Sequence, residues 1–93
     1  MTKVSKSTIR EVMKDYRENN RNYGGYHVQL NLTTGEMWID WFIDGNSWNE
    51  YKDENIIDVP VAHVMNHFGA TIEALSFAVE DLNKDGFRVE VVA

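Results

Sequence analysis

The sequence contains no cysteine and only one proline in 93 residues. The absence of cysteine excludes disulfide bonds and thiolate metal sites, and it is typical of a protein in a reducing compartment. No apolar run approaches the ~20 residues that a membrane-spanning helix needs. The N-terminal stretch lacks the continuous apolar segment of a secretory signal. We therefore expect a soluble, cytoplasmic protein that does not enter a membrane.

Length and composition indicate one folded domain, residues 1–93. A chain of this length is too short for two ordinary domains. Its hydrophobic content of 43% and charged content of 26% are those of a globular chain and exclude a disordered one.

Charge is distributed unevenly along the chain, whose net charge is −6. Residues 1–30 carry six bases and three acids, whereas residues 31–93 carry three bases and twelve acids. A broad basic footprint is what nucleic-acid binding normally requires, so this balance argues against direct binding of nucleic acid. It favours a basic protein surface as the partner.

The spacing of apolar residues predicts an α+β domain. In chain order, we expect an N-terminal helix from Ser5 or Ser7 to Asn19, an antiparallel β-hairpin, a candidate third strand around residues 56–59, a helix pair or one kinked helix after Pro60, and a C-terminal strand over residues 87–92. An even-length loop in the hairpin puts the apolar residues of both strands on one face, whereas an odd-length loop would place Asp40 opposite Val28. The expected core face is Tyr26, Val28, Leu30, Leu32, Met37, Ile39, Trp41 and Ile43.

The other face of the second hairpin strand alternates acids with aromatic residues. Successive residues on one face of a strand lie ~6.6–6.8 Å apart. Two interpretations remain open: an exposed binding face, or a face covered by helices with its aromatic residues in the core. The second would bury an unpaired carboxylate, which is costly. With a tryptophan from the following turn, the candidate partner-binding residues are Glu36, Trp38, Asp40, Phe42, Asp44 and Trp48.

His63 and His67 are candidate metal ligands. Their i, i+4 spacing places them on one helical face, a spacing that can hold zinc with a third ligand from elsewhere, for which Asp58, Glu73 and His27 are candidates. A protease-type zinc site would need a glutamate directly after the first histidine, where Val64 stands. A solvated histidine pair is the commoner case, so we expect no metal or other cofactor.

No catalytic constellation emerges from the sequence. His27 and Asp40 are expected to face each other across the hairpin, as a general base and its orienting acid would. No serine or cysteine nucleophile accompanies them, and the chain has no glycine-rich phosphate loop. We therefore expect a protein that is not an enzyme.

Basic residues line one side of the N-terminal helix at steps of three and four: Lys6, Arg10, Lys14, Arg17 and Arg21. Such a row is most often a solvated helix flank. It also allows pairing with the acidic segment, within one chain or between two copies in a homodimer.

Residues 60–92 resemble the helix-turn-helix and first wing strand of winged-helix regulators. The matching positions are Gly69, Thr71, Ala74, Leu75, Val79, Leu82 and Gly86. The resemblance implies a DNA-binding helix, but the exposed side of that helix carries Glu73, Glu80 and Asp81 and no arginine or lysine. The alternative function is therefore that of a transcription regulator whose winged helix is degenerate.

The whole chain resembles in type the small anti-defence proteins of phages and mobile elements, the anti-CRISPR and anti-restriction proteins. It is short, acidic and free of cysteine and of catalytic motifs. The resemblance implies an inhibitor that offers an acidic–aromatic face, as a nucleic-acid mimic, to the basic groove of a bacterial defence nuclease. A further alternative is a small-ligand or carbohydrate binder that uses Trp38 with Gln29, Asn31 and Asp40.

Overall fold

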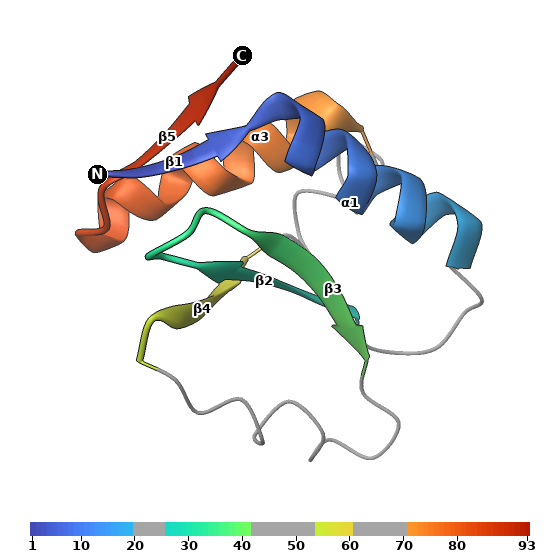
Figure 1. Cartoon of the computed structure of the whole chain (residues 1–93), viewed down its shortest axis with the longest axis horizontal. Coiled ribbons are helices and arrows are strands. Elements are labelled where there is room, and N and C mark those ends of the chain that lie inside the picture. The colour runs from blue at the N-terminus through green and yellow to red at the C-terminus, as the bar shows by residue number, and fades with distance from the viewer. Residues whose placement is uncertain (20–25, 42–53, 61–70) are drawn as a thin grey trace.

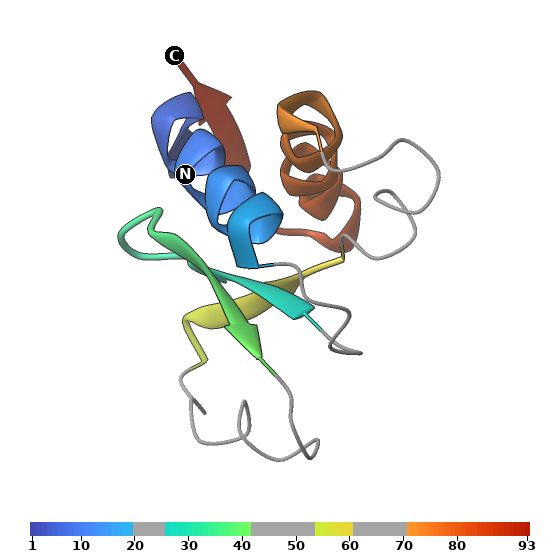
Figure 2. The same ribbon diagram turned by 90° about the vertical axis from the view of Figure 1, so that its right-hand side faces the viewer.

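A computed structural model describes residues 1–19, 26–41, 54–60 and 71–93. It is an α+β fold, as predicted. The elements are β1 (Thr2–Ser5), α1 (Lys6–Asn19), β2 (Tyr26–Asn31), β3 (Met37–Trp41), β4 (Ile56–Val59), α3 (Ile72–Asp81), the 3-10 helix η2 (Leu82–Asp85) and β5 (Val89–Val92). Helices α1 and α3 lie on one side of the three-stranded sheet formed by β2, β3 and β4 (Figures 1 and 2).

Helix α1 forms because its apolar residues recur at helical spacing. Ile9, Val12 and Met13 are buried, and Tyr16 packs at the margin of the core. The helix begins after Ser5, whose hydroxyl accepts a hydrogen bond from the Thr8 backbone N–H at 3.1 Å. The predicted helix and its start at a serine are confirmed.

The three-stranded sheet has β2 in the centre, with β3 and β4 antiparallel on either side. Val28 pairs with Ile39, and Leu30 pairs with Met37, which is the register that the hydrophobic pattern predicts. The candidate third strand is confirmed as β4. Val28 and Leu30 have no exposed surface. The central strand therefore places its apolar residues in the core.

Strand β1 was not predicted from the sequence. It pairs in parallel with β5, so that strands from opposite ends of the sequence lie side by side, with Val4 opposite Val91 (Figure 1). The Thr2 hydroxyl also donates a hydrogen bond to the Leu32 carbonyl at 2.6 Å. Only Val4 among these four residues is apolar, so no local alternation marks the strand. Its pairing depends on β5, at the opposite end of the sequence.

The C-terminal helix begins and ends as predicted. The Thr71 hydroxyl caps α3 by accepting a hydrogen bond from the Ala74 N–H at 3.1 Å. Gly86 follows η2 in the left-handed conformation, with φ of 93°. Lys84 forms a 2.7 Å ion pair with Asp81, and this hydrogen-bonded carboxylate raises the pKa of Lys84.

Two structural expectations lie outside the described residues. One is the helix over residues 61–68, and with it the choice between a helix pair and one kinked helix. The other is the end of the second hairpin strand after Trp41. Among the helices that the structure describes, none is both long enough and apolar enough to span a membrane.

Candidate protein-binding groove

The predicted acidic–aromatic face can be followed over its first half. Glu36 is exposed just before β3, and Trp38 is half-buried within the strand. Asp40 pairs with His27 in the sheet register, as the sequence predicted for this pair. Three of the six predicted site residues fall outside the described residues: Phe42, Asp44 and Trp48.

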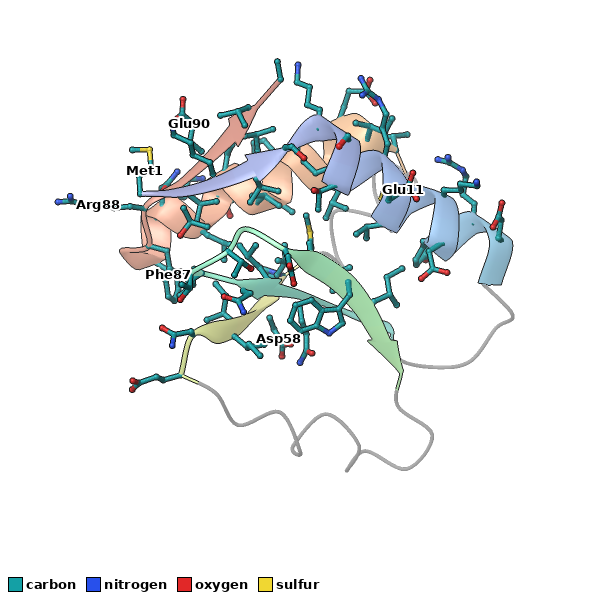
Figure 3. The ribbon with its side chains drawn as sticks, viewed as in Figure 1. Met1, Glu11, Asp58, Phe87, Arg88 and Glu90 are labelled. Atoms are coloured by element: carbon teal, nitrogen blue, oxygen red, sulfur yellow. The ribbon has the colours of Figure 1, made fainter. Side chains whose placement is uncertain are left out.

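A polar row crosses the face of the sheet that is turned away from the helices. The register places Gln29 between Trp38 on β3 and Asp58 on β4 (Figure 3 labels Asp58). The Trp38 Nε1–H donates to Gln29 Oε1 at 3.1 Å, and Gln29 Nε2 lies 3.5 Å from Asp58 Oδ1. The side chain of Gln29 is only 3% exposed. Its amide therefore already contacts Trp38 and Asp58. It is not available to hydrogen-bond a sugar ring, as the carbohydrate-binding alternative would need.

A concave surface lies between helix α1 and strand β3. It consists of two adjoining hollows of about 420 and 270 Å³. Glu11, Met37 and Trp38 line both hollows. Because they share these residues, the hollows form one groove along the line where the helix passes over the strand. We call this surface the α1–β3 groove.

Among the described residues that line the α1–β3 groove, the charged ones are all acidic. Glu11 and Asp15 flank it from the helix, and Glu36 flanks it near the hairpin turn. Met37 and Val12 are buried beneath it, and Ile39 packs against the core. The groove thus combines an apolar floor with a negative rim.

The basic row of α1 does not line this groove. The described members, Lys6, Arg10, Lys14 and Arg17, are all exposed. Since residues four apart lie on one helical face, Glu11 and Asp15 form an acidic flank distinct from that row. The two charged flanks of α1 therefore offer separate surfaces of opposite sign.

The contribution of α1 to this site was not predicted from the sequence. Glu11 and Asp15 are spaced i, i+4 beside the apolar residue Val12, and this spacing indicates an acidic face next to the core. Whether that face belongs to a binding site depends on which strand packs beside the helix. That contact joins segments more than twenty residues apart, which local patterns do not reveal.

The two histidines proposed as metal ligands, His63 and His67, lie outside the described residues. Within the part of the chain that the structure describes, no group of three or more histidine, aspartate or glutamate side chains is arranged to hold a metal ion.

The segment that resembles a winged helix is only partly described. On α3, the exposed residues include Glu73, Phe77 and Glu80, which present acids and an aromatic ring where phosphate contacts would be needed. The strand that follows, β5, pairs in parallel with β1, whereas a wing is an antiparallel hairpin. These features give the DNA-binding alternative no support.

No protein-family model matches the chain, and the comparisons find no significant match among curated proteins or solved structures. The α1–β3 groove, through its shape and its charge, is therefore the feature that bears on function.

Proposed function

We propose that this protein is a non-enzymatic protein-binding module that engages a basic protein surface. The observation that carries the proposal is the α1–β3 groove, with its apolar floor and its rim of Glu11, Asp15 and Glu36. Complementary charge around an apolar centre steers association and fixes the register of a complex. Trp38 is half-buried on β3, with its ring on the face of the sheet turned away from the helices, and it adds beside the groove an aromatic anchor of the kind found at binding hot spots.

The partner we propose is a nucleic-acid-binding groove, as in a bacterial defence nuclease that acts in the cytoplasm. The net charge of −6 supports this choice, because such grooves are positively charged. The resemblance in type to small anti-defence proteins points the same way.

A binding panel tests the proposal. The protein would be immobilised and exposed to purified nucleases and other nucleic-acid-binding proteins with isoelectric points above about 9. Acidic proteins of similar size serve as controls. We expect members of the basic set to bind, with affinity falling at least about tenfold between low and physiological salt.

Heparin, a soluble polyanion, distinguishes the kind of surface that is bound. If the partner's nucleic-acid groove is occupied, heparin should compete with the protein for it. Binding by none of the basic proteins, or equal binding to the acidic controls, would refute the proposed function. Binding that heparin leaves unchanged would refute the nucleic-acid groove as the target.

A further inference from the structure

Strand β3 is an edge strand of the three-stranded sheet. Strand β2 lies on one side of it, and the described residues place no strand on the other. An edge strand presents a row of backbone donors and acceptors that can pair with another chain. The α1–β3 groove lies along this strand, so a segment entering the groove would meet these backbone groups.

The hairpin register identifies which backbone groups face outward. The Asn31 N–H donates to the Glu36 carbonyl at 2.8 Å, so these two residues form a hydrogen-bonded pair. In an antiparallel ladder bonded and non-bonded pairs alternate. Trp38 and Asp40 are therefore bonded to β2, whereas the backbone groups of Met37 and Ile39 point toward the open edge.

Acids lie on both sides of the position that an added strand would take. Glu11 projects from helix α1, above the face that carries Met37 and Ile39 (Figure 3). Glu36, directly before β3, is exposed and two residues from Trp38, so by strand alternation it lies on the same face as Trp38. Side chains from either face of an added strand would therefore approach a carboxylate.

We propose that an extended segment of the partner, rich in arginine or lysine, adds to the edge of β3 as a fourth strand. This inference rests on the proposed function and specifies its mode of recognition. Backbone hydrogen bonds to Met37 and Ile39 supply affinity, and the flanking acids select basic side chains. On the outer face, a cation placed over the Trp38 ring gains a further attraction.

Charge selects this occupant over a second copy of the same chain. If two β3 edges paired with each other, Glu36 of each copy would be brought toward the acids of the other. Like charges placed at an edge are a common means of preventing such self-pairing. The same acids attract a basic segment, so the edge discriminates between the two occupants.

The test uses the full-length protein labelled with nitrogen-15 and a synthetic decapeptide of alternating arginine and valine. A decapeptide of alternating glutamate and valine is the matched control. On adding the arginine peptide, we expect amide hydrogen exchange at Met37 and Ile39 to slow at least about tenfold. The Trp38 amide is an internal control, because it is already bonded to β2 and should change little.

The outcomes separate this inference from the proposed function. If basic proteins bind in the panel but no arginine peptide protects the Met37 and Ile39 amides, strand addition is wrong while the proposed function stands. Equal protection by the glutamate peptide would also refute it, because recognition would not depend on charge. Protection that grows with protein concentration alone would identify a second copy as the occupant and overturn the choice of a basic segment.

Discussion

The indole nitrogen of Trp38 donates a hydrogen bond to the side-chain oxygen of Gln29 at 3.1 Å. This bond crosses from edge strand β3 to central strand β2, and it satisfies an amide that is 3% exposed. One aromatic residue of the predicted binding face is therefore also part of the structure of the sheet. Its ring is held in place before any partner arrives, which lowers the entropic cost of binding.

Replacing Trp38 with phenylalanine should destabilise the fold. The substitution keeps an aromatic ring but leaves the buried Gln29 oxygen without its donor, which costs about 1–3 kcal/mol. Urea unfolding of Trp38→Phe, Gln29→Leu and the double variant measures the coupling between the two side chains. We expect the double variant to lose less than the sum of the single changes. Strict additivity would contradict a direct interaction.

Gly35→Ala should be among the most damaging substitutions in the hairpin. Gly35 has φ of 75°, and a Cβ atom there would overlap the Lys3 carbonyl oxygen of β1. Left-handed backbone alone costs about 1 kcal/mol for alanine. We therefore expect a loss of at least about 2 kcal/mol in thermal or urea unfolding, with the added part due to the contact with β1.

Gly86→Ala is the matched control for that experiment. Gly86 also has a positive φ, of 93°, but a Cβ atom there meets nothing within 4 Å. We expect it to cost only about 1 kcal/mol. Equal losses in the two variants would show that the hairpin turn does not pack against β1.

Asn83→Ala should loosen strand β5. The Asn83 side chain accepts a hydrogen bond from the Val89 N–H at 2.8 Å and donates one to the Val89 carbonyl at 2.9 Å. Losing both bonds should cost about 1–3 kcal/mol and should speed amide exchange in β5 and its partner β1. Asp85→Ala, an exposed change in the same turn, should leave both quantities nearly unchanged. Similar effects from the two variants would contradict this role for Asn83.

The elements with clear local patterns were predictable from the sequence. Helix α1 follows from the spacing of Ile9, Val12 and Met13, and the hairpin register follows from the alternation that pairs Val28 with Ile39. Thr71 and Gly86 marked the limits of the C-terminal helical segment because their preferences at helix ends are strong.

The elements and site residues that depend on contacts between distant parts of the sequence were not predictable. Strand β1 has a single core residue, Val4, and exists as a strand through its pairing with β5. The predicted site included Glu36 and Trp38, which lie just before and within β3, but it omitted Glu11. That residue reaches the site only because α1 packs over β3, and no pattern within the helix specifies its neighbour.

We propose that the acids of the α1–β3 groove, and not the total charge of the protein, bind the basic partner. The most direct test compares Glu11→Lys/Glu36→Lys with Glu80→Lys/Asp85→Lys. Both double variants replace two exposed acids with bases and so add +4 to the net charge of −6, but Glu80 and Asp85 do not line the groove.

The affinity of each double variant for a basic protein from the panel is measured at one salt concentration, after circular dichroism confirms that both are folded. We predict that the groove variant loses at least about thirtyfold in affinity, because it places like charges against the partner, while the control variant loses less than about threefold. Equal losses of affinity in the two variants would contradict the proposal that the groove acids, and not the total charge, bind the partner.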